Sequence, residues 1–233
     1  MKRKKVFFSE LAYIMGIVVL AFGTALMEKA DFGLSMVVVP AYLLHLKISQ
    51  YIFVFTFGMA EYFLQMIFIF VLSLYMRKFK VTYLFSFMTA MIYGFVLDIM
   101  ITLVHTMPLI GIGGRIIYYF VGIFLCAMGV SLLFHTYIPL EAYELVVKEV
   151  SNKTNINISI VKTIYDWTSC LVGICLSFVF FGLWQFEGIK LGTIICTFCN
   201  GFLIGKCNKI LHDLFDFRDA LLIRKKFESE NIS

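Results

Sequence analysis

The chain has 233 residues, of which 61% are hydrophobic and only 15% are charged, with a formal net charge of +5 and a mean hydropathy of +0.91. Soluble proteins average roughly 45–50% apolar and about 25% charged residues. This composition excludes a cytosolic enzyme, a nucleic-acid-binding domain and a disulfide-rich secreted module. It predicts an integral membrane protein with little mass outside the bilayer.

Six long apolar segments follow one another along the chain, at about 7–27, 51–76, 83–105, 115–138, 158–183 and 189–211. Each is close to the roughly 20 residues that cross a bilayer as a helix. Their apolar runs are continuous and lack the alternation of transmembrane β-strands, so we expect an all-α membrane fold. The first segment follows four basic residues, as a signal peptide would. Its apolar core is longer than the roughly 7–15 residues of a signal peptide, which favours a retained helix.

Basic residues are distributed unequally between the loops. Sixteen of the 20 lie in 1–6, 77–82, 139–162 and 206–233, whereas the other loops hold only Lys29, Lys47, Arg115 and Lys190. Because cytoplasmic loops carry the excess of lysine and arginine, both termini are predicted in the cytoplasm. We expect a single membrane domain over 1–212 and a cytoplasmic tail over 213–233. Apolar residues recur in the tail at helical spacing, which predicts an amphipathic helix on the inner leaflet.

The two halves of the chain resemble each other. The matching positions are Gly16, Ala21, Gly23 and Leu26 with Gly122, Ala127, Gly129 and Leu132, then Ile48-Ser49 with Ile158-Ser159, and Gly94-Phe95 with Gly201-Phe202. The halves, about 7–106 and 113–211, would each hold three spans. Because three is odd, the second half would be inverted relative to the first, as in many transporters. The alternative is chance similarity between apolar helices rich in glycine and alanine.

Each half also holds a shorter, interrupted segment after its first span. One runs from Asp31 through Gly33 and Ser35, and the other runs from Pro139 through Glu141. Both start with residues that break or cap helices. They are predicted to be half-helices that enter the bilayer from opposite faces, where paired broken segments mark substrate sites. Two amphipathic helices lying on the membrane surface are the alternative.

The chain resembles the YczE/YyaS group of predicted bacterial membrane proteins, which is similar to the YitT group. The resemblance covers nearly the whole membrane part, and it is carried by Lys29–Ser35, Gly94–Asp98, Gly122–Gly129 with the Pro139 segment, and Gly188–Thr193 with Gly201. Met36 stands where that group usually has proline. The resemblance implies a multi-pass protein of the bacterial inner membrane and implies no established activity.

Ionisable groups inside apolar spans are costly and mark candidate sites. Glu61 lies ten residues into its span without a basic residue one turn away, and Asp98 should lie in the outer half of the bilayer. Gly94, one turn before Asp98, leaves room for close helix approach. Asp166 has Lys162 four residues before it, which predicts an ion pair. Glu61 and Asp98 could equally make buried hydrogen bonds between helices.

The candidate substrate-binding or proton-relay residues are Asp98, Glu61, Asp31, Ser35, Gly94, Asp166 and Glu141. The sequence contains no phosphate loop, nucleophile elbow or pair of histidines at metal-ligand spacing, so we expect no enzyme, cofactor or metal site. Cys196-x-x-Cys199 has zinc-ligand spacing but lies in an apolar span. We expect a small-solute transporter that is embedded in the lipid bilayer. We expect no nucleic-acid partner. The alternative is a non-transporting accessory protein, or a substrate-binding subunit of a larger complex, which binds a membrane protein through the small-residue face of Ala21 and Ala25.

Overall fold

The computed structural model describes residues 5–108, 111–156, 158–182 and 189–220, which contain eight helices and two short strands. Six of the helices are long and apolar enough to cross a membrane, which confirms the predicted all-α membrane fold. They are α1 (Ser9–Ala30), α3 (Phe57–Met76), α4 (Val81–His105), α5 (Gly111–Phe134), α7 (Ile158–Phe181) and α8 (Leu191–Leu214).

Two short helices lie in the predicted interrupted segments. Helix α2 (Val39–Ile48) has 10 residues and α6 (Ala142–Thr154) has 13, so at about 1.5 Å per residue both fall well short of the roughly 30 Å hydrocarbon core. Val39 and Ala41 at the start of α2 and Ala142 at the start of α6 are at most 1% exposed. Buried N-termini favour half-helices that enter the bundle over helices that lie on its surface.

Helices α1 and α5 form the closely packed centre of the molecule. A Cβ atom added to Gly23 would lie 2.8 Å from the Gly122 carbonyl oxygen, and one on Gly16 would lie 3.2 Å from that of Gly129. Under the offset of 106, Gly16 corresponds to Gly122 and Gly23 to Gly129. Each glycine therefore contacts the counterpart of the other one, which is the reciprocity of a two-fold interface.

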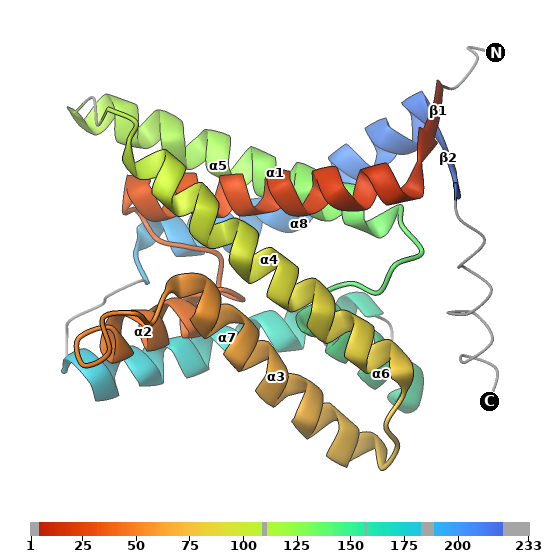
Figure 1. Cartoon of the computed structure of the whole chain (residues 1–233), viewed down its shortest axis with the longest axis horizontal. Coiled ribbons are helices and arrows are strands. Elements are labelled where there is room, and N and C mark those ends of the chain that lie inside the picture. Colours follow the sequence, from red (N-terminus) through yellow and green to blue (C-terminus); the bar gives the residue numbers. More distant parts are fainter. Residues whose placement is uncertain (1–4, 109–110, 157, 183–188, 221–233) are drawn as a thin grey trace.

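The remaining helices pack around this centre in matching pairs. Helix α4 lies against α1 and α8 lies against α5, while α2 packs on α7 and α6 packs on α3. In Figure 1, α1, α5 and α8 make one layer, and α2 and α6 lie at opposite ends of the other. Two pairs break the match: α4 packs closely on α3 and also contacts α6, but in the described part of the chain α8 makes no comparable contact with α7 or with α2.

The C-terminal ends of the short helices are held by equivalent lysines. Lys47 near the end of α2 donates to the Phe180 carbonyl oxygen at 3.2 Å, and Lys153 near the end of α6 donates to that of Tyr75 at 2.6 Å. The two lysines are 106 residues apart, and each caps the last turn of the long helix on which its short helix packs. These contacts are what an inverted repeat predicts, although the proposed repeat boundaries stay a prediction.

One of the three sequence matches between the halves is wrong in structural terms. Ile48 ends α2, whereas Ile158 begins α7, so these positions are not equivalent. The apolar segment predicted from residue 51 also becomes helical only at Phe57, because the Thr56 hydroxyl caps α3 by accepting from the Met59 backbone N–H at 3.1 Å.

The chain ends differ from the predicted amphipathic tail helix. Helix α8 stops at Leu214, and Phe215–Arg218 forms strand β2, which pairs in parallel with β1 (Lys5–Phe8). Both strands carry aromatic side chains, and Phe7 packs against Phe215 and Phe217 with ring centroids 5.2 and 5.7 Å apart. This aromatic contact favours an extended segment over the predicted helix. The predicted continuation over 221–233 lies outside the described residues.

Candidate functional site

Two glutamates from separate parts of the chain lie together inside the bundle. Glu61 in α3 is 0% exposed, and Glu141, which occupies the N-cap position of α6 without a side-chain capping bond, is 9% exposed. The side-chain amide nitrogen of Gln65 lies between them, at 3.5 Å from the Glu61 Oε2 and 3.4 Å from the Glu141 Oε2. The Tyr143 hydroxyl donates to the same Glu61 oxygen at 2.8 Å. We call Glu61, Gln65, Glu141 and Tyr143 the acid pair site.

The chain that leads into α6 is held in place by polar groups of α3 and α4. Gln65 Oε1 accepts from the Ala142 backbone N–H at 3.0 Å, and Thr89 donates to the Pro139 carbonyl oxygen at 2.9 Å. Ser86 donates to the Leu140 carbonyl oxygen. Pro139 and Leu140 are half-buried and Glu141 and Ala142 are buried, so unpaired backbone groups would be costly here, and these side chains pair three of them.

The acid pair site retains unsatisfied acceptors. The Oε1 atoms of Glu61 and Glu141 are both buried and have no hydrogen-bond partner in the described part of the chain. Burial, followed by the charge of Glu61, raises the pKa of Glu141, which lies outside the long helices, to about 8. Two ionised carboxylates that both lie next to the Gln65 amide group would repel each other, so a proton on one of them is favoured.

Asp98 lies in a different environment from the acid pair. Its carboxylate accepts from the Thr56 hydroxyl at 2.6 Å and from the Gly58 backbone N–H at 2.8 Å, so it caps the N-terminus of α3. Gly94 lets the two helices approach, because a Cβ atom there would lie 2.6 Å from the Gly58 carbonyl oxygen. No hydrogen bond joins Asp98 to Glu61 among the described residues. In this structure Asp98 therefore caps a neighbouring helix, and Gly94 allows the close packing of α3 and α4.

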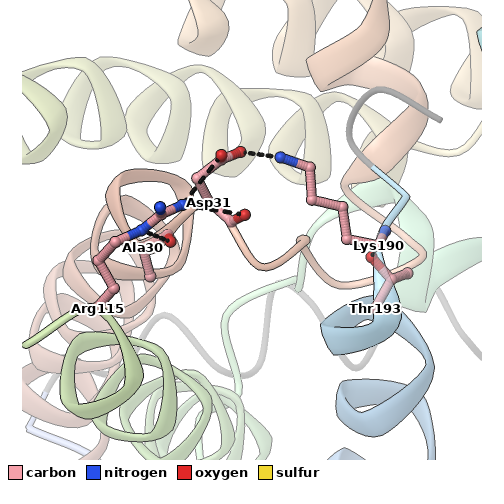
Figure 2. A network of polar contacts seen from close by, with 5 residues as sticks. All are labelled: Ala30, Asp31, Arg115, Lys190 and Thr193. Atoms are coloured by element: carbon pink, nitrogen blue, oxygen red, sulfur yellow. Dashed lines mark hydrogen bonds and ion pairs between the residues drawn. The ribbon is translucent and has the colours of Figure 1, made fainter. Parts of the chain in front are cut away.

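Asp31 and Ser35 lie at one end of the molecule. Figure 2 shows Asp31 between Arg115, whose guanidinium is 3.1 Å from the carboxylate, and Lys190, which also pairs with it. The Asp31 side chain is 57% exposed, so these ion pairs form an exposed network that connects the ends of α1, α5 and α8. Ser35 is one of the helix-breaking or helix-capping residue types in this segment, but the N-cap of α2 is Val38, without a side-chain bond. The Ser35 carbonyl oxygen instead accepts from the N–H groups of Val38 and Val39.

Asp166 makes the predicted contact with Lys162, at 3.6 Å on the same face of α7. Lys162 also pairs with Glu144 of α6 at 2.7 Å. This lysine therefore links α7 to α6, and its partner Glu144 lies about one helical turn after Glu141. Asp166 belongs to that link, and within the described residues no hydrogen bond joins it to Glu61 or Glu141.

Sequence reasoning missed two members of the acid pair site. Gln65 follows Glu61 by four residues in the same apolar span, and that spacing places both side chains on one helix face, which was a usable signal. Nothing in the sequence pointed to Tyr143, because its contact depends on how α6 docks on α3. Among the described residues, no group of three or more His, Cys, Asp and Glu side chains is arranged to hold a metal ion.

The small-residue face of α1 is part of the interior. Ala21 and Ala25 are both 0% exposed, and they pack in clusters that include residues of α4 and α5. The prediction that this face binds a membrane-protein partner is wrong, because helices of the same chain occupy it.

Comparisons with known proteins identify a family and no activity. No curated protein matches the chain, and no solved structure matches it. One family model does match the chain, and its description does not name the YczE/YyaS or YitT groups. Residues 7–209 match a family of unknown function, DUF6198, and the chain therefore belongs to that family.

Proposed function

We propose that this polytopic membrane protein is a small-solute transporter in which Glu61 and Glu141 exchange a proton as α6 moves. The observation that carries the proposal is the acid pair site itself, a pair of buried carboxylates joined by Gln65, each with an unpartnered oxygen. Gln65 is the ninth of the 20 residues of α3, so the site lies near the middle of a spanning helix. Ionisable groups at such depth are costly and are kept mainly for function.

The position of the acid pair relative to α6 supports coupling between proton and conformation. The N-terminus of a helix carries a partial positive charge, and Glu141 lies at the N-terminus of α6. Loss of the proton would add a negative charge that α6 attracts and Glu61 repels. The balance of these two forces would differ between two positions of α6, so protonation would bias which position the helix takes.

Unequal packing of the two halves supports alternating access. The contacts of α1 with α5, and of the two short helices with α7 and α3, are reciprocal, but α3 packs on α4 far more closely than α7 packs on α8. An inverted-repeat transporter closed on one side and open on the other would have this asymmetry. If α7 packed closely on α8 while α3 separated from α4, the substrate site would open to the opposite side of the membrane.

The distribution of cations supports an orientation. Lys80, Lys148 and Lys153 lie at one end of the bundle, while Lys29, Arg115 and Lys190 lie at the other. We assign the first end, with both termini, to the cytoplasm, because that end holds the excess of basic loop residues. The resemblance to bacterial membrane proteins favours the inner membrane of a bacterium. A scaffold role is less well supported, because the interior contains buried charge and the expected docking face is covered.

The test begins with a thermal-shift screen of the purified protein in detergent against classes of small metabolites. A solute that binds the folded state raises the melting temperature in proportion to its saturation. The same solute is then measured in proteoliposomes with an imposed pH gradient, for the wild type, Glu61→Gln and Glu141→Gln. Glu28→Gln is the matched control, since Glu28 lies near the C-terminal end of α1, outside the acid pair site, and pairs with His105.

We expect the gradient to drive uptake in the wild type and the control, and both acid pair variants to lose the response while still melting cooperatively. Gradient-driven uptake that survives in both variants would refute the proton role. A screen in which no solute class shifts the melting temperature would favour the scaffold reading instead.

A further inference from the structure

We propose that the protein binds the phosphate headgroup of an anionic phospholipid in a basic pocket where the α3–α4 turn meets the C-terminal half of α6. The pocket is an open cavity of about 540 Å³, and it is separate from the acid pair site. Its lining residues are Met76, Lys80, Lys148, Glu149, Asn152 and Lys153. The inference does not depend on the transport proposal.

The charges around the pocket leave it positive. Lys80 binds both oxygens of Glu149 at 2.9 Å, and the Tyr83 hydroxyl donates to the same carboxylate at 3.4 Å. This single carboxylate is buried and already neutralised, with its side chain 7% exposed. Lys148 and Lys153 then contribute two further positive charges that no acidic lining residue offsets.

The two further lysines of the pocket differ in how they are held. Lys153 donates to the Tyr75 carbonyl oxygen, and its ammonium lies 3.7 Å from the centroid of the Tyr75 ring, so it is positioned at the pocket edge. Lys148 lines the pocket and is exposed, and no hydrogen bond or ion pair of the described residues involves it. Lys148 is therefore available to a phosphate group in the pocket, with which it would make a charge-assisted hydrogen bond.

The surroundings of the pocket favour a lipid over a soluble anion. Leu74 and Phe79, on either side of the α3–α4 turn, are 63% and 64% exposed, and they are large apolar side chains. Arg77 and Lys78 between them are also exposed. A phosphate group in the pocket would therefore place its acyl chains on the apolar face of α3, which a free phosphate would leave unused. Basic pockets at the cytoplasmic ends of membrane helices bind anionic headgroups in this way.

Thermal unfolding of the full chain in a neutral detergent tests the site. Phosphatidylglycerol is titrated into the wild type and into Lys148→Gln, with phosphatidylcholine as the zwitterionic lipid and with glycerol phosphate and inorganic phosphate as soluble anions. Lys209→Gln is the matched control, because Lys209 is an exposed lysine on α8 away from the pocket. Lys148→Arg keeps the charge and should bind as the wild type does.

We expect phosphatidylglycerol to raise the melting temperature of the wild type and Lys209→Gln in a saturable way, and phosphatidylcholine to have little effect. In Lys148→Gln the half-saturating concentration should rise about fivefold, the change expected for loss of one cation near an anionic lipid. Equal titrations of Lys148→Gln and the wild type would overturn the site. Equal stabilisation by inorganic or glycerol phosphate would overturn the lipid assignment and indicate a soluble phosphate ligand.

Discussion

The close approach of α3 and α4 at Gly58 and Gly94 gives a sharp prediction for Gly58→Ala. An added Cβ atom at residue 58 would lie 2.0 Å from the Gly94 carbonyl oxygen and 2.6 Å from the Asp98 carboxylate. Because such contacts rarely fall below 3.0 Å, α3 and α4 would have to separate by about 1 Å, and both partners at the contact belong to rigid elements. Overpacking of this kind costs about 1–3 kcal/mol, and alanine returns at most about 1 kcal/mol in helix propensity.

Gly201→Ala is the control for this substitution. Gly201 lies in α8, and an added Cβ atom there meets nothing within 4 Å, so only the propensity gain applies. Unfolding in detergent, followed by circular dichroism against temperature, should give Gly58→Ala a melting temperature below that of the wild type and Gly201→Ala one equal or higher. If the two variants melted at the same temperature, the packing of α3 on α4 described above would be wrong.

Three further predictions concern individual side chains. Asp98→Ala should lower the free energy of unfolding by about 1–3 kcal/mol in denaturant titrations, because it leaves the Thr56 hydroxyl and Gly58 N–H without their acceptor; an unchanged midpoint would contradict the capping role. Asp31→Ala should cost less than about 1 kcal/mol, and the cost should vanish in molar salt, because its ion pairs are exposed. Burial raises the pKa of Glu141 to about 8 from 4.5, so the folded state keeps a proton that the unfolded chain has lost between these values. Stability should therefore fall as pH rises through that window, by up to about 1.4 kcal/mol per pH unit, and level off above it. Glu141→Gln should flatten the difference between melts at pH 5 and pH 8.

The membrane fold was largely predictable from the sequence. Long apolar runs are imposed by the thickness of the bilayer, so the six spanning helices follow from length and hydropathy alone. Pro139 and Gly33 signalled the two short helices, because proline and positive-φ glycine interrupt helical backbone, and Gly33 has φ of +112°. Helix ends were less accurate, since the start of α3 depends on the Thr56 cap and the tail depends on a strand pairing between distant ends of the chain.

The candidate site was only partly predictable. The depth of Glu61 in an apolar run identified it as unusual, and the position of Glu141 in the broken segment identified it separately. Their meeting depends on docking of α6 against α3, a contact between residues about 80 positions apart that leaves no local pattern. Asp98 carried the same signal as Glu61, but a neighbouring helix N-terminus satisfies its charge. Hydropathy reports that a charge is buried, and it does not report which partner neutralises it.

Infrared spectroscopy of the purified protein tests the central claim most directly. A carboxyl group that keeps its proton in an apolar interior has a carbonyl stretch distinct from that of an ionised carboxylate. We predict that the wild type retains this band at pH 7, that the band disappears as the pH is raised beyond 8, and that Glu141→Gln or Glu61→Gln changes it while Glu28→Gln does not. A spectrum at pH 7 without any protonated carboxyl band, or with a band that both acid pair variants leave unaltered, would contradict the account.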